Sequence, residues 1–115
     1  MTSRIQFRCR IYRDADIAIG PGKVELLEAL AETGSISAAA RRMGMSYRRA
    51  WLLIDEVNRC LVKPAVLTTV GGARGGGAEL TDTGREVILR YRAMEGVARL
   101  AAASEIAALS RLIAK

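Results

Sequence analysis

The 115-residue chain contains no histidine and only two cysteines, and none of its apolar runs is long. The missing histidine excludes His-dependent catalytic triads, His-ligated metals and the usual neutral-pH general base. Cys9 and Cys60 are too few for a disulfide framework and too distant for a local metal clip, so we expect neither metal nor cofactor and a cytoplasmic location. No apolar run approaches the roughly 20 residues of a membrane helix, and arginines interrupt the apolar N-terminal residues, which excludes a signal peptide and membrane contact.

Length and composition predict one globular domain over residues 1–115, because half of the residues are hydrophobic and disordered chains have far fewer. The net charge of +6 is concentrated in residues 35–75, which carry +5, whereas residues 1–34 sum to zero and residues 76–115 to +1. Fifteen of the 18 cations are arginine, which suits phosphate forks and guanine edges better than lysine does. The codon usage of a GC-rich genome explains the preference for arginine but not the clustering, so the charge pattern favours nucleic-acid binding.

Residues 1–20 are predicted to form a β-hairpin. Apolar residues alternate with polar ones up to Ile11, a period of two that is typical of a half-buried strand. Residues 13–16 supply turn-forming side chains, and the alternation resumes after them. Cys9 lies on the apolar face of this pattern, so we expect it to be a small buried side chain.

Residues 21–62 are predicted to form a three-helix core. The first helix covers residues 21–32, with a proline in its first turn. Gly34 follows it where a left-handed C-terminal cap is needed. Ser35 is a good N-cap for a short, alanine-rich second helix that ends at Met43.

The last two helices of this core have the spacing of a helix-turn-helix. Gly44 can adopt the positive φ that the turn requires, and the small Ala40 four residues earlier lets the next helix approach closely. Ser46 is a good N-cap for a third helix over residues 47–61. That helix carries an amphipathic stripe, formed by Ala50, Leu53, Ile54, Val57 and Leu61. Taken alone, this segment fits an ordinary pair of packed helices about equally well.

Residues 65–80 are predicted to form a second hairpin, the wing of a winged helix. Two short strands flank the loop GGARGGG, residues 71–77, with Arg74 near its tip. A nucleotide-binding glycine loop is excluded because no Gly-Lys-Ser/Thr follows and the loop joins two strands rather than a strand and a helix. Residues 81–115 predict a long C-terminal helix, with Ser104 as a candidate break. This order of elements predicts an α+β, mostly α, winged helix-turn-helix fold.

The stretch ETGSISAAARRMGMSYRRAW and the later GGARGGGAELTDTG closely resemble the N-terminal DNA-binding domain of ModE-type, molybdate-responsive bacterial transcriptional regulators. More distantly, the chain resembles the winged helices of LysR-type regulators, and the resemblance covers roughly residues 5–95. It implies a homodimer that binds a palindromic operator in double-stranded DNA, with the helix that begins at Ser46 and Tyr47 in the major groove. ModE-type proteins sense molybdate through C-terminal domains, so we expect no molybdate site within this chain, which ends at Lys115.

The start of the third helix is the predicted centre of DNA recognition, because side chains in the first two turns of a recognition helix enter the major groove. Arg48 lies about 200° around the helix from Ala50 and points away from the core, so we predict that it reads a base. Arg49 lies about 100° from Ala50, which suits a phosphate. Trp51 has two open interpretations, packing on the N-terminal hairpin or lying along the DNA. The predicted DNA-binding residues are Ser35, Ser37, Arg41, Arg42, Ser46, Tyr47, Arg48, Arg49, Trp51, Arg74 and Gly75.

The last predicted helix carries more apolar surface than one stripe against a small core can cover. We therefore predict that residues 81–115 form a homodimer interface, with help from the N-terminal hairpin. The alternative function is a winged-helix module for protein–protein interaction, whose apolar interface would depend little on salt, whereas DNA binding would weaken steeply. A small enzyme ranks third, because the sequence has no histidine and no paired-carboxylate motif.

Overall fold

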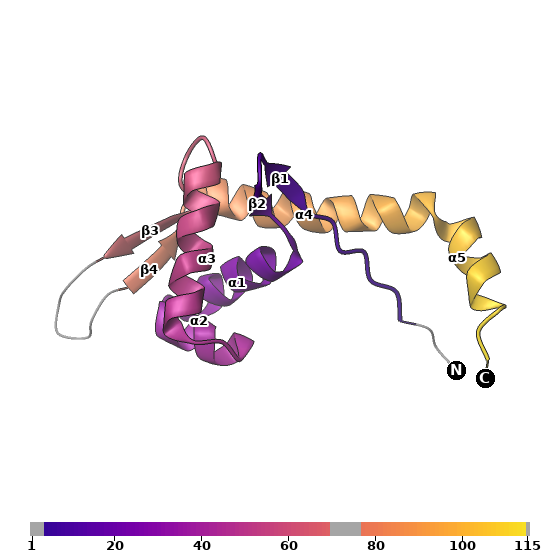
Figure 1. Cartoon of the computed structure of the whole chain (residues 1–115), viewed down its shortest axis with the longest axis horizontal. Helices are drawn as coiled ribbons and strands as arrows, with labels where there is room; N and C mark the ends of the chain where they lie inside the picture. The colour runs from indigo at the N-terminus through magenta and orange to yellow at the C-terminus, as the bar shows by residue number, and fades with distance from the viewer. Residues whose placement is uncertain (1–3, 70–76, 115) are drawn as a thin grey trace.

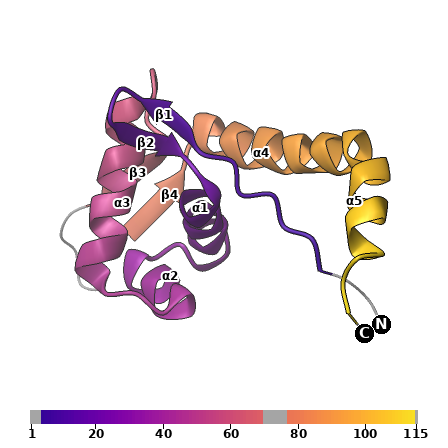
Figure 2. The same ribbon diagram turned by 45° about the vertical axis from the view of Figure 1, so that its right-hand side comes forward.

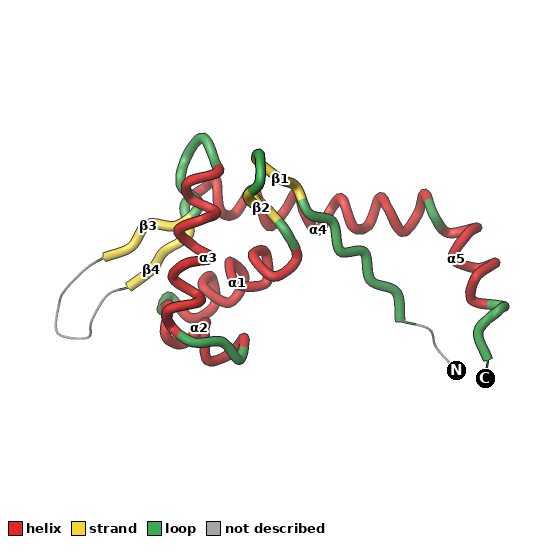
Figure 3. The backbone as a smooth tube through the Cα atoms, in the orientation of Figure 1, coloured by secondary structure: helices red, strands yellow, loops and turns green. Residues whose placement is uncertain are grey.

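Helices and two short hairpins make up the protein in the computed structural model, which describes residues 4–69 and 77–114. The helices are α1 (Pro21–Thr33), α2 (Ile36–Met43), α3 (Tyr47–Cys60), α4 (Asp82–Ala101) and α5 (Ala103–Ser110). The hairpin of β1 (Ile11–Arg13) and β2 (Asp16–Ile19) precedes α1, and the hairpin of β3 (Val66–Thr69) and β4 (Gly77–Leu80) lies between α3 and α4. This order confirms the α+β, mostly α, class, with a wing formed by β3 and β4 after a three-helix core (Figure 1 and Figure 3).

The turns between the first three helices form where the sequence predicts them. Gly34 and Gly44 both adopt left-handed conformations, with φ of 69° and 68°, and end α1 and α2. The Ser35 hydroxyl accepts a hydrogen bond from the N–H of Ala38 at 3.2 Å, and so caps α2. The Ser46 hydroxyl does the same for α3. These short-range contacts fix where α3 begins and therefore which side chains occupy its first turn.

The hydrophobic core lies between the first three helices and the base of the wing. Its largest fully buried side chains come from α1 and β3, and they are Val24, Leu26, Leu27, Leu30 and Val66. Ala50, Ile54 and Val57 bury the predicted stripe of α3 against them. Because small alanines of α2 fill the space between, α2 and α3 pack closely. The rotation of α3 about its own axis is therefore fixed by packing.

Two residues hold the start of α4 against the wing. The hydroxyl of Thr81 donates to the carbonyl oxygen of Pro64 at 2.7 Å and accepts from the N–H of Gly84 at 3.0 Å. A Cβ at Gly84 would stand 2.3 Å from the carbonyl oxygen of Ala65, so only glycine allows this approach. The direction of α4 away from the core follows from this contact (Figure 2).

The N-terminal hairpin is shorter than the sequence predicts. Its ladder runs only from Ile11↔Ile19 to Arg13↔Asp16, and residues 4–10 are extended without a strand partner. The prediction that Cys9 is buried is wrong, because its side chain is exposed. Its carbonyl oxygen instead accepts a hydrogen bond from the Tyr91 hydroxyl of α4 at 2.8 Å. The alternating pattern thus reflects an extended segment that packs beside a helix, and not a paired strand.

The predicted single helix over 81–115 is divided. Ala102, with φ −96° and ψ 6°, separates α4 from α5, two residues before the proposed break at Ser104. No described residue of α5 is buried, and the second half of α4 projects beyond the core (Figure 1). Within the described residues, α5 is therefore not buried against the core. Neither helix, nor any other helix in the described ranges, is long and apolar enough to cross a membrane.

Candidate nucleic-acid interface

The first turn of α3 presents a basic and aromatic surface. Ser46 caps it by accepting from the N–H of Arg49 at 3.1 Å. Tyr47 is 53% exposed, Arg48 and Arg49 are both exposed, and Ala50 is completely buried. This rotation matches the one predicted from the sequence, with Arg48 on the side of the helix away from the core. The positive end of the α3 dipole adds to the charge of the two guanidinium groups.

The charge of α3 changes along its length. Within the described residues, no carboxylate lies within ion-pair distance of Arg48 or Arg49. At the other end, the Nε of Arg59 donates to Oδ2 of Asp55 at 2.9 Å, and this hydrogen bond raises the pKa of the guanidinium group. A recess of about 410 Å³ runs along this outward side, and it is lined by Ser46, Arg48, Arg49, Leu52, Leu53, Glu56 and Arg59. An anionic ligand is therefore attracted to the N-terminal half of the helix.

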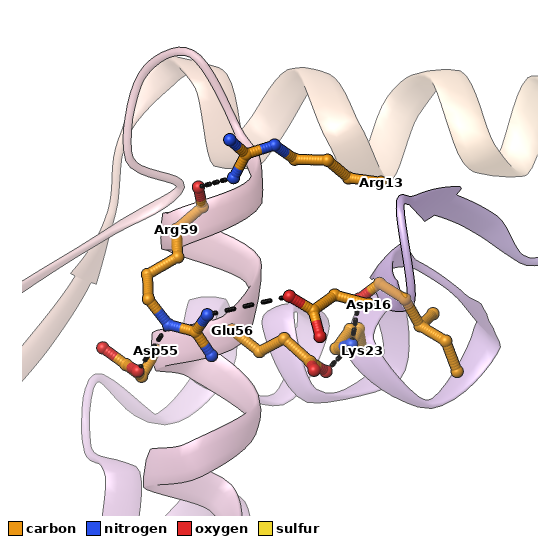
Figure 4. A network of polar contacts seen from close by, with 7 residues as sticks. Arg13, Asp16, Lys23, Asp55, Glu56 and Arg59 are labelled. Carbon is orange, nitrogen blue, oxygen red and sulfur yellow. Dashed lines mark hydrogen bonds and ion pairs between the residues drawn. The ribbon is translucent and has the colours of Figure 1, made fainter.

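Ion pairs fasten the C-terminal half of α3 to the N-terminal hairpin and to α1 (Figure 4). Nη1 of Arg13 donates to the carbonyl oxygen of Arg59 at 3.0 Å, and Nη1 of Arg59 lies 3.8 Å from Oδ2 of Asp16. The Nζ of Lys23 donates both to the carboxylate of Glu56 and to the carbonyl oxygen of Ile17. Because Lys23 is only 6% exposed, this junction joins α1, β2 and α3 inside the fold.

The sequence analysis missed Lys23 as a positioning residue. The one local signal is that Lys23 is the only basic residue of α1 and stands next to the apolar Val24. Its partner, Glu56, lies 33 residues further along the chain, and only the tertiary structure brings the two together.

Trp51 lies on the same side of α3 as Asn58. It lies seven residues before Asn58, which places the two side chains within about 20° of the same direction. Asn58 binds β3, accepting from the N–H groups of Ala65 and Val66 at 2.8 and 3.2 Å and donating to the Val66 carbonyl oxygen at 3.0 Å. Trp51 is 39% exposed, and its place along the DNA stays a prediction. Asn58, which the sequence analysis also missed, fixes the wing relative to α3.

Of the predicted DNA-binding residues in and before α2, two already make contacts within the protein and two are exposed. The Ser35 hydroxyl is used as the helix cap, while Ser37 is exposed in the first turn. Arg41 is exposed at the end of the helix, whereas Arg42 forms an ion pair with Glu32 of α1. The structure therefore leaves Ser37 and Arg41 more available to a ligand than Ser35 and Arg42.

Two predicted residues, Arg74 and Gly75, lie outside the described part of the chain. The described strands of the wing pair from Val66↔Leu80 to Thr69↔Gly77. In residues 4–69 and 77–114, no three His, Cys, Asp or Glu side chains converge in the manner of a metal site.

Comparisons with known proteins agree with this geometry. Residues 22–85 match the family described as bacterial regulatory helix-turn-helix proteins of the LysR family. The chain is 40% identical over 92 residues to the molybdenum transport protein ModE of Azotobacter vinelandii, covering 78% of this chain and 34% of that protein. It is 47% identical over 88 residues to the molybdenum-pterin-binding protein MopB of Rhodobacter capsulatus, covering 76% and 33%. The DNA-binding transcriptional dual regulator ModE of Escherichia coli K12 is 41% identical over 71 residues, covering 62% and 27%.

The chain thus spans about a third of the length of these relatives. Among solved structures, a MarR family transcription regulator superposes with a TM-score of 0.57 at 22% identity, covering 82% of this chain and 66% of the other. That likeness concerns the fold alone, and it agrees with a three-helix core followed by a wing.

Proposed function

Because the chain belongs to the LysR family of bacterial regulatory helix-turn-helix proteins, we propose that it regulates transcription by binding a specific sequence of double-stranded DNA as a homodimer. Membership in this family, whose described role is regulatory, places the chain outside the enzymes. In the proposed complex, the start of α3 enters the major groove and the wing lies against the adjacent backbone. The molybdenum named in the relatives is assigned to no residue of this chain, and the proposed location is the cytoplasm, where the DNA is.

One observation carries the proposal: the capped first turn of α3 exposes Tyr47, Arg48 and Arg49 beside one another. The two arginines have no carboxylate partner among the described residues, and the acidic side chains of α3, Asp55 and Glu56, are paired with Arg59 and Lys23. Arg48 is the proposed base reader, because it points away from the core and its forked donors fit O6 and N7 of guanine. Arg49, on the flank of the helix, is proposed to bind phosphate. Ser37, Arg41, Arg74 and Gly75 are proposed contacts to the backbone.

The proposed dimer forms through α4 and α5. Six large apolar side chains of these two helices and the C-terminal residues after them are more than half exposed: Leu89, Val97, Leu100, Leu109, Leu112 and Ile113. A groove of about 250 Å³ between the N-terminal hairpin and α4 continues this surface, and its apolar lining includes Ile11, Ile19 and Met94. Exposed apolar area on this scale favours burial against a second copy.

Binding and sedimentation measurements test the two parts of this proposal. We expect the protein to select discrete fragments from fragmented genomic DNA, and its affinity for them to fall steeply as salt rises. Weak dependence on salt together with capture of no fragment would favour the protein–protein interaction module instead. A monomer at micromolar concentration in sedimentation would remove the homodimer.

A charge placed in the exposed apolar surface sharpens the test of the dimer. Leu100→Glu is expected to shift the sedimentation coefficient towards that of the monomer, because a carboxylate would be buried in the interface. Val62→Glu is the matched control, since Val62 is fully exposed in the loop after α3, two residues before Pro64, which is hydrogen-bonded to the N-cap of α4 at the opposite end of that helix from Leu100. Equal effects of the two substitutions would contradict an interface through α4.

A further inference from the structure

Three arginines from two distant parts of the chain border one cleft beside α3. Arg8 and Arg10 come from the extended N-terminal segment, and Arg49 comes from the first turn of α3. The cleft has a volume of about 260 Å³, and the first turn of α1 and the side chains of Met45 and Leu53 complete it. We call it the basic cleft. None of the residues that line it is acidic, and the only other cation there, Lys23, is already paired with Glu56.

The arginines of the basic cleft differ from three of the four arginines of α4. Arg85, Arg90 and Arg92 each form an ion pair with a carboxylate. Among the described residues, no carboxylate lies within ion-pair distance of Arg8 or Arg10. Three guanidinium groups around one cleft repel one another unless an anion lies between them. The cleft therefore has the charge of a site for a polyanion.

The N-terminal segment is held in place at the cleft. The Tyr91 hydroxyl, on a residue that is only 3% exposed, donates to the carbonyl oxygen of Cys9, between the two arginines. The stem of Arg10 packs on Gly20, where a Cβ would stand 3.4 Å from Cγ of Arg10. These contacts keep both guanidinium groups near the surface of α3, so that the charge does not move away with a loose terminus.

The start of α1 faces the same cleft. The first hydrogen bond of the helix runs from the N–H of Val24 to the carbonyl oxygen of Gly20 at 3.0 Å. The N–H groups of Gly22 and Lys23 come before it in the chain and make no hydrogen bond within the helix. Gly20 offers no side-chain cap, and the first turn holds no acidic residue. These N–H groups add partial positive charge to that of the arginines.

The basic cleft is continuous with the surface that α3 presents to DNA. Arg49 lines both the cleft and the recess that contains Arg48. Phosphates on one DNA strand follow one another at about 3.4 Å along the helix axis, so a duplex seated on Arg48 carries further phosphates past Arg49. We propose that the basic cleft binds the phosphate backbone of the duplex just outside the base pairs that α3 reads. This inference rests on the proposed function and extends its footprint.

The test compares two lengths of one duplex. A fragment selected by the wild-type protein is prepared once with flanking base pairs and once trimmed to the segment that α3 and the wing protect, and affinity is measured against salt. Each phosphate neutralised adds about 0.9 to the slope of log K against log[salt]. The double variant Arg8→Ala/Arg10→Ala should therefore lower that slope by about 1.8 on the extended duplex and leave it unchanged on the trimmed one. Between 50 and 200 mM salt this difference corresponds to about 12-fold in affinity.

Two further variants separate charge from folding. Arg4→Ala is the matched control, because Arg4 is an exposed arginine of the same segment that does not line the basic cleft; it lines a neighbouring pocket with Glu25 and Glu95, which Arg8 also borders. Arg8→Lys/Arg10→Lys keeps the charge, so most of the slope should be retained. If the double alanine variant matches Arg4→Ala on the extended duplex, the basic cleft is not a DNA site. If the wild type selects no fragment, or Arg48→Ala changes nothing, the proposed function itself fails.

Discussion

The two halves of α3 carry similar residues and use them in opposite ways. In the N-terminal half, Arg48 and Arg49 are exposed and have no carboxylate near them among the described residues. In the C-terminal half, Arg59 is held by Asp55, and Glu56 is held by the buried Lys23. An arginine that is already paired with a carboxylate neutralises a DNA phosphate less well, whereas an unpaired one can displace the counterions condensed on that phosphate. One end of the helix thus fixes its position in the fold, and the other end remains free for a ligand.

The largest effect is expected from breaking the buried junction at the C-terminal half. Lys23→Met keeps the length of the side chain but leaves the carboxylate of Glu56 and the carbonyl oxygen of Ile17 without their donor. The free energy of unfolding should fall by about 3 kcal/mol, since a partly buried charge and a carbonyl group lose their partner. Urea unfolding at fixed protein concentration measures this, because the stability of the proposed dimer would depend on concentration.

A second substitution shows whether this loss comes from the ion pair. In Lys23→Met/Glu56→Gln, the unpaired carboxylate is gone, and part of the lost stability should return. DNA affinity, measured well below the unfolding midpoint, should change much less than stability in both variants. Equal stability of Lys23→Met and the wild type would show that α3 is fixed by apolar packing alone.

The next effect concerns specificity at the N-terminal half. Arg48 and Arg59 are eleven residues apart, so they share one face of α3 to within about 20° and stand about 16 Å apart along its axis. Arg48→Ala should lower discrimination at one or two operator positions by about 2 kcal/mol, or about 30-fold. Arg59→Ala removes the same charge from the same face, yet it should leave the affinity within about twofold, because its guanidinium group is already paired.

Arg49→Ala completes this comparison. It should weaken binding to every sequence by a similar factor, since a phosphate contact carries no sequence information. Competition binding with a set of single-base operator variants separates the two outcomes. If Arg49→Ala relaxes the base preference and Arg48→Ala does not, the rotation of α3 against the groove is different from the one proposed.

The sequence predicts those features of α3 that short-range contacts determine. Gly44, Ser46 and the stripe through Ala50 act within a few residues, so the start and the rotation of α3 follow from local chemistry. Lys23 with Glu56, and Asn58 with Val66, join elements that only the tertiary structure brings together. A local pattern holds no information about such partners.

The N-terminal segment illustrates the same limit. Its period of two correctly indicates that one face is apolar, and Ile5 and Phe7 are half-buried. The period does not tell whether the neighbour is a strand or a helix, and here it is α4, through Tyr91. The prediction that Cys9 is buried is wrong for that reason. The break at Ala102 lies two residues before the candidate at Ser104, and its exact position has no local marker, because alanine favours helix and the bend occurs where α4 has left the core.

The smallest effect tests how far along α3 the DNA extends. Asp55 and Arg59 form an exposed pair four residues apart, so Asp55→Asn should cost at most about 0.5 kcal/mol of stability. If DNA contacts only the N-terminal half, its affinity at 0.15 M salt should stay within about twofold, since Asp55 lies about 10 Å along the axis from Arg48, beyond the Debye length of about 8 Å. Asp82→Asn is the matched control, because it removes another exposed acid that is paired with an arginine, Arg85, at the start of α4. Tighter binding and a steeper salt slope for Asp55→Asn than for Asp82→Asn would mean that the freed Arg59 reaches a phosphate, and that DNA lies along both halves of the helix.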